Sequence, residues 1–164
     1  MRNRLPLFFG LLLGMVAVDQ AVKAWVRGAL NPGQYLAGGK PWPGVFEITL
    51  SYNEGVAFGM FQGQGVLLSP IAILIGGFSV WYALKHRDDP AWSIVAMALL
   101  GAGAFGNLID RLWLGKVTDM FYFRPINFPV FNVADSCITI AALMLIRGWT
   151  KKPEPAQDAS AGNA

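Results

Sequence analysis

Four hydrophobic stretches alternate with shorter polar segments along the chain. They cover about residues 5–26, 66–84, 91–114 and 132–149. A helix needs roughly 20 apolar residues to cross about 30 Å of hydrocarbon, and each stretch approaches that length. The pattern therefore predicts an α-helical integral membrane protein with four transmembrane helices in one domain, residues 1–150. Residues 151–164 are rich in Pro, Ala, Ser and Gly and are expected to form a disordered tail.

A period of two replaces the long apolar runs between the first two stretches. Phe46, Ile48, Leu50 and Tyr52 alternate with polar residues, which predicts a half-buried strand. The turn residues 53–55 and a returning strand at 56–61 would complete a small antiparallel sheet within a β region at about 34–61. Residues 116–130 contain two prolines and several aromatic residues, and are expected to form an interfacial loop or a short helix.

The polar residues of the four stretches gather at one membrane face. An even number of crossings brings the end of spans one and three and the start of spans two and four to the same side. That side holds Asp19, Gln20, Lys23, Asn107, Asp110, Arg111, Asn132 and Asp135. Slightly more of the 13 Lys and Arg residues fall on the side of the termini, so the positive-inside rule favours cytoplasmic termini. The polar face is then extracytoplasmic.

The composition is that of a membrane protein, and it limits the kinds of side chain that can carry out a reaction. Hydrophobic residues make up 54% of the chain and charged residues only 14%, whereas soluble domains carry about 25% charged residues. One Cys and one His exclude a disulfide framework and leave almost no set of metal ligands, so no metal and no cofactor are expected. The net charge of +3 is dispersed, which argues against nucleic acid and fits anionic lipid. Carboxylates, amides and hydroxyls must carry any chemistry.

The third stretch combines a packing pattern with a polar cluster. Ala98, Ala102 and Gly106 recur at four-residue intervals, which lets helix backbones approach closely and fixes the placement of the residues after Gly106. Asn107, Asp110 and Arg111 then lie on one face of the helix. Asp110 is explained by pairing with neighbours that hold the helices together. The donors of Asn107 and Arg111 suit contact with a peptide carbonyl or with a lipid phosphate or ester.

Two further pairs have both a structural and a functional interpretation. Asp19 and Lys23 are spaced for an ion pair within one helix, and the alternative is that they anchor a catalytic loop. Asn132 is a good N-cap, and Asp135 three residues later suits the positive end of the helix dipole. Asp119 alone would be an ordinary turn residue. Capping and turn formation therefore remain alternatives to catalysis at these positions.

Asp119 and Asp135 together favour a catalytic interpretation. Span three leads into the loop that carries Asp119, and span four begins beside it, so both carboxyls can enter one pocket. Two carboxylates in a low-dielectric pocket tend to share a proton, which supplies both the base and the acid that amide hydrolysis needs. A Ser–His route is disfavoured because His86 lies on the opposite face. A thiol route is disfavoured because Cys137 has no His partner and is expected to be a small buried residue.

Five blocks of residues resemble the lipoprotein signal peptidase (signal peptidase II) family of bacterial membrane aspartic peptidases. In chain order, the blocks that carry the resemblance are residues 19–23 (DQAVK), 53–59 (NEGVAFG), 103–111 (GAFGNLIDR), 117–119 (VTD) and 131–136 (FNVADS). The resemblance implies that Asp119 and Asp135 are the catalytic dyad. It also implies that the substrate site is lined by Asn53, Asn107, Arg111 and Asn132, and that structural support comes from Asp19, Lys23, Gly106 and Asp110.

The same resemblance implies a substrate, a location and an inhibitor. The substrate would be a diacylglyceryl-modified prolipoprotein, cut just before the lipidated Cys. The location would be the bacterial inner membrane, with contacts to membrane lipid and the active site near the outer leaflet. Globomycin-type cyclic peptides would inhibit, and the chain is expected to act as a monomer. One departure from the family pattern is Met120, where the family usually places Phe, so the packing beside Asp119 is expected to differ.

Two other functions compete with peptide hydrolysis. In metal-dependent lipid headgroup transfer, Asp110, Asp119 and Asp135 would bind Mg²⁺ through oxygen ligands. In a non-enzymatic carrier or proton pathway, the intramembrane acids would mark a conduction route. The second alternative expects polar residues throughout the depth of the bilayer, whereas here they concentrate at one end of the spans.

Overall fold

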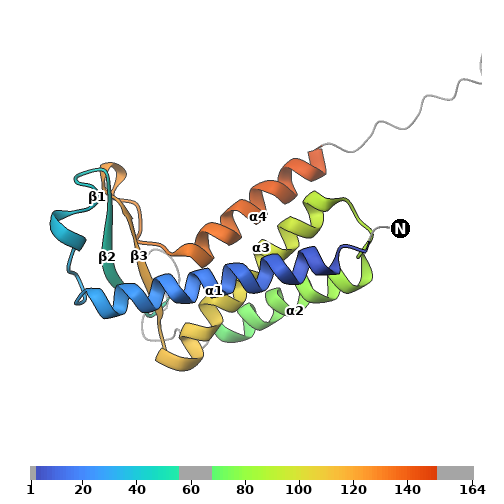
Figure 1. Cartoon of the computed structure of the whole chain (residues 1–164), viewed down its shortest axis with the longest axis horizontal. Coiled ribbons are helices and arrows are strands. Elements are labelled where there is room, and N and C mark those ends of the chain that lie inside the picture. The colour runs from blue at the N-terminus through green and yellow to red at the C-terminus, as the bar shows by residue number, and fades with distance from the viewer. Residues whose placement is uncertain (1–2, 56–67, 151–164) are drawn as a thin grey trace, which may run out of the picture.

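The computed structural model describes residues 3–55 and 68–150. This part of the chain holds four α-helices and a three-stranded sheet (Figure 1). The helices are α1 (Leu5–Ala29), α2 (Ser69–Lys85), α3 (Ala91–Leu114) and α4 (Val133–Thr150). The strands are β1 (Pro41–Trp42), β2 (Phe46–Asn53) and β3 (Val117–Phe123). The mostly helical class with a small antiparallel sheet is therefore as predicted.

Helix α3 lies at the centre and packs against the other three helices. Its small residues allow this, because an added Cβ at Gly101 would overlap Ser79 Oγ, and one at Gly103 would overlap the carbonyl oxygen of Ala134. Phe8 and Leu12 of α1 join Ile94, Met97, Ala98 and Ala102 of α3 in one buried cluster. The packing seam predicted for α3 is confirmed.

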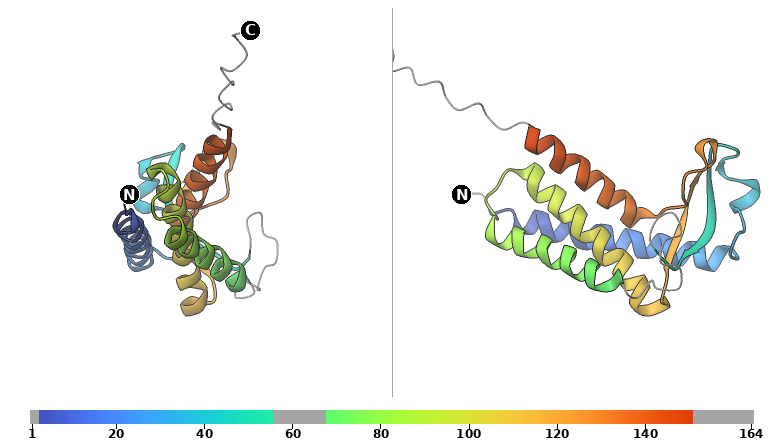
Figure 2. Two further views of the ribbon diagram at one scale, coloured as in Figure 1. Left: turned by 90° about the vertical axis from the view of Figure 1, so that its right-hand side faces the viewer. Right: turned by 180° about the vertical axis from the view of Figure 1, so that it is seen from behind.

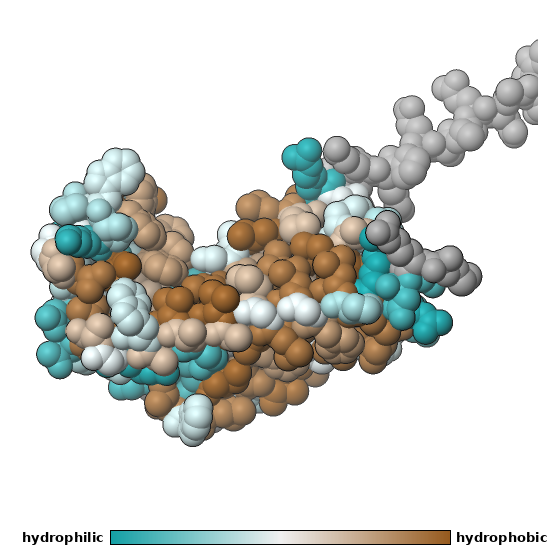
Figure 3. All heavy atoms as spheres, viewed as in Figure 1, coloured by the Kyte–Doolittle hydropathy of each residue, from teal (hydrophilic) through white to brown (hydrophobic). Residues whose placement is uncertain are grey.

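The outer surface of the bundle is apolar. Large hydrophobic side chains are exposed on all four helices, among them Leu13, Leu74, Trp113 and Leu143. Helices α1 and α3 are long and apolar enough to cross a membrane, and α2 is apolar but has only 17 residues. In Figure 3, hydrophobic residues cover the helices and hydrophilic residues gather mainly at the two ends of the molecule. Such a surface is suited to lipid rather than to water.

The sheet stands across one end of the bundle, opposite the α2–α3 connection (Figures 1 and 2). Its order is β1-β2-β3, and both pairings are antiparallel. The predicted strand at 46–53 is confirmed, whereas the returning strand predicted at 56–61 lies outside the described residues. In the described part of the chain β2 pairs with β3, where Tyr52 lies opposite Thr118 and Ser51 opposite Asp119.

The segment 116–130 differs from its prediction. Residues 117–123 form β3 rather than a loop, and only Arg124–Ile126 form a short 3₁₀ helix. The β-branched and aromatic residues of β3 favour a strand, but its partner lies about 70 residues earlier, so no local pattern reveals the pairing. Met120, the departure from the family pattern, is fully buried with Val26, Leu30 and Leu50.

The burial of β2 also differs from simple alternation. Glu47 and Thr49 were expected on the polar side, yet they are only 4% and 5% exposed. Glu47 pairs with Arg124 at 2.6 Å, and the Thr49 hydroxyl donates to the carbonyl of Gln34. Because these polar groups have partners, their burial is not costly. Both faces of β2 are thus partly covered.

Candidate active site

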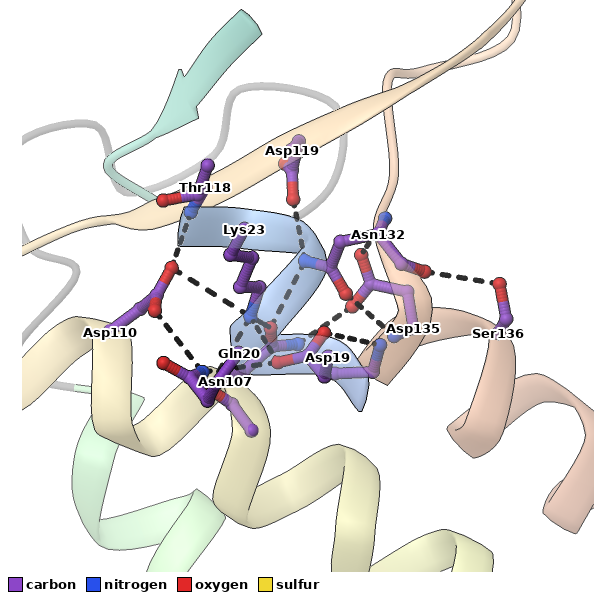
Figure 4. Close-up of polar contacts among 12 residues, drawn as sticks. Asp19, Gln20, Lys23, Asn107, Asp110, Thr118, Asp119, Asn132, Asp135 and Ser136 are labelled. Atoms are coloured by element: carbon purple, nitrogen blue, oxygen red, sulfur yellow. Dashed lines mark hydrogen bonds and ion pairs between the residues drawn. The ribbon is translucent and has the colours of Figure 1, made fainter. Parts of the chain in front are cut away.

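Polar side chains from α1, α3, β3 and α4 converge where the sheet meets the bundle (Figure 4). Helix α1 contributes Asp19, Gln20 and Lys23, and α3 contributes Asn107 and Asp110. Strand β3 brings Asp119, and the start of α4 brings Asn132 and Asp135. In this group Asp19, Lys23, Asn107, Asp110, Asp119 and Asn132 are buried. The predicted gathering of polar residues at one end of the helices is therefore present.

The first turn of α4 is a reciprocal cap. Asn132 Oδ1 accepts the backbone N–H of Asp135 at 2.9 Å, and Asp135 Oδ2 accepts the backbone N–H of Asn132 at 3.3 Å. This arrangement satisfies donors that a helix start leaves open. Asp135 has a further contact, because Asn107 Nδ2 donates to its Oδ1 at 2.7 Å. The capping role is confirmed, and the contact from α3 shows that Asp135 does more than cap.

Two amides connect the two carboxyl groups. Asn132 Nδ2 donates to Asp119 Oδ1 at 2.6 Å and to Asn107 Oδ1 at 3.1 Å, while the Asn107 amide donates to Asp135. Asp119 and Asp135 are thus linked through two asparagines from different elements. Asp119 is only 2% exposed.

Burial, together with the nearby charge of Asp135, raises the pKa of Asp119 to about 7. Hydrogen bonding from Asn132, the Lys23 ammonium and the Asn53 amide act in the opposite direction without cancelling the rise. A carboxyl group that titrates near neutral pH is able to hold a proton and release it during a reaction. This is the property that a proton-sharing dyad requires.

A buried ion pair lies beneath the two asparagines. Lys23 Nζ is 2.9 Å from Asp19 Oδ2 and donates to Asn107 Oδ1 at 3.0 Å. The other oxygen of Asp19 accepts the backbone N–H of Ala134 at 2.9 Å, which ties α1 to the start of α4. At Gly106 an added Cβ would lie 2.7 Å from Asp19 Oδ2, closer than real Cβ contacts come. The ion pair predicted for Asp19 and Lys23 is confirmed, and Gly106 provides the space for it.

Asp110 contacts β3 in the same way that Asp19 contacts the start of α4, by accepting a backbone N–H. Its Oδ2 accepts the backbone N–H of Thr118 at 2.8 Å, and its carboxylate lies 3.7 Å from both Lys23 and Arg27. Asp19 and Asp110 therefore each hold the backbone of the residue that precedes Asp135 or Asp119. Pairing with neighbours, the explanation offered for Asp110 from the sequence, is confirmed.

No role was assigned from the sequence to three residues of this network, Gln20, Arg27 and Thr118. Gln20 Nε2 donates to Asp19, to the carbonyl oxygen of Gly106 and to Asp110. Arg27 Nη1 donates to the hydroxyl of Thr118 at 2.9 Å. The sequence could have pointed to Gln20 and Thr118 because each is adjacent to a candidate acid, Asp19 or Asp119. The contacts that join α1 to α3 and β3 were not predictable, because they link residues more than 80 positions apart.

The acids face a cavity of about 950 Å³. Asn53, Asn107, Arg111, Asp119 and Asp135 all line it, together with apolar residues of α2 and α4 that include Ile71, Ile75, Ile138 and Ile140. The Arg111 Nε is buried without a hydrogen-bond partner in the described part of the chain. Of the four residues predicted to bind substrate, Asn132 differs: it is fully buried and contacts the acids rather than the open space.

Asp110 is held by its protein partners rather than grouped with the two acids of the cavity. Across the residues that the structure describes, no three His, Cys, Asp or Glu side chains are grouped as a metal site requires. His86 lies at the other end of the helices, where its ring stacks on Tyr82, and Cys137 is buried as predicted. The polar side chains that line the cavity carry the carboxyls of Asp119 and Asp135, the amides of Asn53 and Asn107, the Arg111 guanidinium, and the hydroxyls of Ser51, Tyr52, Ser136 and Thr139.

Comparison with known proteins gives consistent matches over most of the chain. Residues 11–150 match the model of the family described as signal peptidase (SPase) II. A lipoprotein signal peptidase of Gloeobacter violaceus is 38% identical over 159 residues, which cover 94% of this chain and 90% of that protein. A lipoprotein signal peptidase of Streptococcus thermophilus is 36% identical over 135 residues, which cover 82% of this chain and 86% of the relative.

Solved structures agree with the sequence relatives. A bacterial membrane enzyme superposes with a TM-score of 0.81 at 28% identity, over 93% of this chain and 96% of that one. A second structure of a bacterial membrane enzyme gives a TM-score of 0.79 at 29% identity, over 91% and 96%. The fold, the apolar helices and the family match thus point to the same class of membrane-bound peptidase. The chain belongs to the signal peptidase II family.

Proposed function

We propose that this chain is an aspartic endopeptidase that removes the signal peptide from diacylglyceryl-modified prolipoproteins, cutting before the lipidated Cys. The observation that carries the proposal is the pair Asp119 and Asp135 in one cavity, joined by the amides of Asn107 and Asn132. The activity for which the relatives are named, lipoprotein signal peptidase, supports the substrate class.

The proposed reaction uses one water molecule and one shared proton. One Asp takes a proton from the water as its oxygen forms a bond to the scissile carbonyl carbon. The other Asp gives its proton to the leaving nitrogen as the C–N bond breaks and the tetrahedral intermediate collapses to a carboxyl group. A proton then returns from the first Asp to the second through solvent. No covalent enzyme intermediate is needed, and the pKa of Asp119 near 7 supports a protonated partner at neutral pH.

The remaining residues of the cavity position the substrate in this proposal. The apolar side chains of α2 and α4 contact the signal peptide and the diacylglyceryl chains, which keeps them out of water. Arg111 and Asn53 donate to carbonyl or ester oxygens of the substrate. The unpartnered Nε of Arg111 supports this role, because a buried donor without a partner is costly until a ligand satisfies it. Positioning of this kind lowers a reaction barrier by several kcal/mol, up to about 7–11 in the best cases.

We also propose that all four helices cross the bacterial inner membrane as one domain, residues 1–150, with cytoplasmic termini. The apolar outer surface of the bundle and the hydrophilic ends support this placement (Figure 3). The cavity then lies near the outer leaflet, where a lipid-anchored substrate enters from the bilayer. In this proposal the chain acts as a monomer in contact with membrane lipid.

A cleavage assay tests the proposed function. Purified protein is incubated with a lipid-modified prolipoprotein, and mass spectrometry detects release of the signal peptide. We expect cleavage to continue with EDTA and to stop with globomycin, the inhibitor implied by the family resemblance. Asp119→Asn and Asp135→Asn should each abolish cleavage while still binding the inhibitor, whereas Asp88→Asn at the other end of the helices should be fully active. Turnover in both active-site variants, or loss of turnover with EDTA, would contradict the proposal.

A further inference from the structure

A second hollow lies beside the main cavity. It has a volume of about 530 Å³ and is bounded by the segment 32–35, by β2 and by the α3–β3 turn. Ser51, Tyr52 and Val130 line both hollows, so the two hollows adjoin at the end of β2. We call the second hollow the β2 groove.

The β2 groove begins close to the acids. Ser51, which lines both hollows, lies directly opposite Asp119 in the β2–β3 pairing. Glu54 lies three residues further along the chain, just past the end of β2 at Asn53, so at an extended rise of about 3.3 Å per residue it is at most roughly 10 Å from Ser51. An extended peptide that leaves the acids over Ser51 therefore needs no more than about three residues to reach Glu54.

The two hollows differ in polarity. Helices α2 and α4 line the main cavity with isoleucines, whereas the β2 groove carries Glu54 and Lys116. Glu54 is exposed, and the Lys116 ammonium lies 4.0 Å from the centre of the Tyr52 ring. An apolar segment is stable in the first hollow and a polar segment in the second. In the proposed substrate the signal peptide and the diacylglyceryl chains are the apolar parts that occupy the first hollow, which leaves the second hollow for the residues after the lipidated Cys.

We propose that the β2 groove binds the first residues of the mature lipoprotein after the lipidated Cys, and that Glu54 and Lys116 select the charge of those residues. This inference rests on the proposed function. Glu54 attracts a basic side chain and Lys116 an acidic one, while Ser51, Tyr52 and Val130 form the passage between the acids and the groove.

Charge-reversal variants test the β2 groove. Lys116→Glu makes the groove acidic, and Glu54→Lys makes it basic. Each variant is assayed with lipid-modified peptides that carry Lys, Asp or Ser at the second to fourth positions, counting the lipidated Cys as the first. The quantity compared is the ratio of kcat/KM for the Lys and Asp peptides. Lys85→Glu and Asp88→Lys, at the opposite end of the helices, are the matched controls, and cleavage of the Ser peptide shows that each variant is folded.

We expect the ratio to rise about twofold to fivefold in Lys116→Glu and to fall by a similar factor in Glu54→Lys, the range typical of exposed charge pairs. Both changes should shrink at high salt, because screening weakens such pairs, and the controls should keep the wild-type ratio. An unchanged ratio in both groove variants, with normal cleavage of the Ser peptide, would overturn the inference and leave the proposed function intact. If the wild-type protein cleaves none of the peptides, the proposed function itself fails and this inference fails with it.

Discussion

Replacement of Asp119 by Asn should make the stability of the protein less dependent on pH. Asp119 is buried beside Asp135, so its ionised form is disfavoured in the folded protein, and its pKa rises from an ordinary value of 3.8 to about 7. In the unfolded chain the same group ionises near its ordinary value. Asn has nearly the same shape, keeps an acceptor for the Asn132 amide and has no proton to lose.

The sign and size of the effect follow from the two pKa values. A raised pKa in the folded state means that the unfolded chain loses its proton first as pH rises. The contribution of Asp119 to stability is therefore fully present below about pH 4 and lost as pH rises through about 7. Each pKa unit is worth about 1.4 kcal/mol, so the loss amounts to at most about 4 kcal/mol. Relative to wild type, Asp119→Asn should gain that free energy of unfolding between these pH values.

Unfolding in detergent micelles measures this gain. Wild type and Asp119→Asn are unfolded between about pH 4 and pH 8, and the difference between their free energies of unfolding is plotted against pH. The plot should rise toward neutral pH and level off above about 7. Asp88→Asn, in the exposed α2–α3 connection, is the control and should give a flat line. A flat line for Asp119→Asn as well would refute the argument that burial and Asp135 disfavour the Asp119 carboxylate.

Three other perturbations test separate parts of the site. The pH profile of kcat/KM should fall about tenfold per pH unit above about 7, because the proton on Asp119 is then lost; a profile that is level to pH 9 would exclude this. Gly106→Ala should lower the free energy of unfolding, measured by thermal unfolding, by about 1–3 kcal/mol, because the added Cβ would press on Asp19. The control Gly77→Ala should be neutral or stabilising, because a Cβ there meets no atom within 4 Å. Lys23→Met should cost about 3–5 kcal/mol, because it leaves the buried Asp19 carboxylate without its cation. A cost no larger than that of Lys85→Met at the helix end would contradict the pairing.

The sequence determined those features of the protein that depend on short-range periodicity. Apolar runs of nearly 20 residues give the helices, and alternation gives β2. Contacts at three- and four-residue spacing were also readable: the cap between Asn132 and Asp135, and the ion pair between Asp19 and Lys23. Helix geometry fixes which residues share a face at these spacings, so no knowledge of the rest of the chain is needed.

Only the tertiary structure decided how these pieces meet. The pairing of β2 with β3, the burial of Glu47 and the amide links from Asn107 and Asn132 to the two acids all join residues far apart in the chain. Residue spacing along the chain does not encode such contacts, because they depend on how closely α1, α3 and α4 pack and on where the loops return. The sequence identified Asp119 and Asp135 as candidate catalytic acids, and the packing of the helices brought both carboxyls to one cavity.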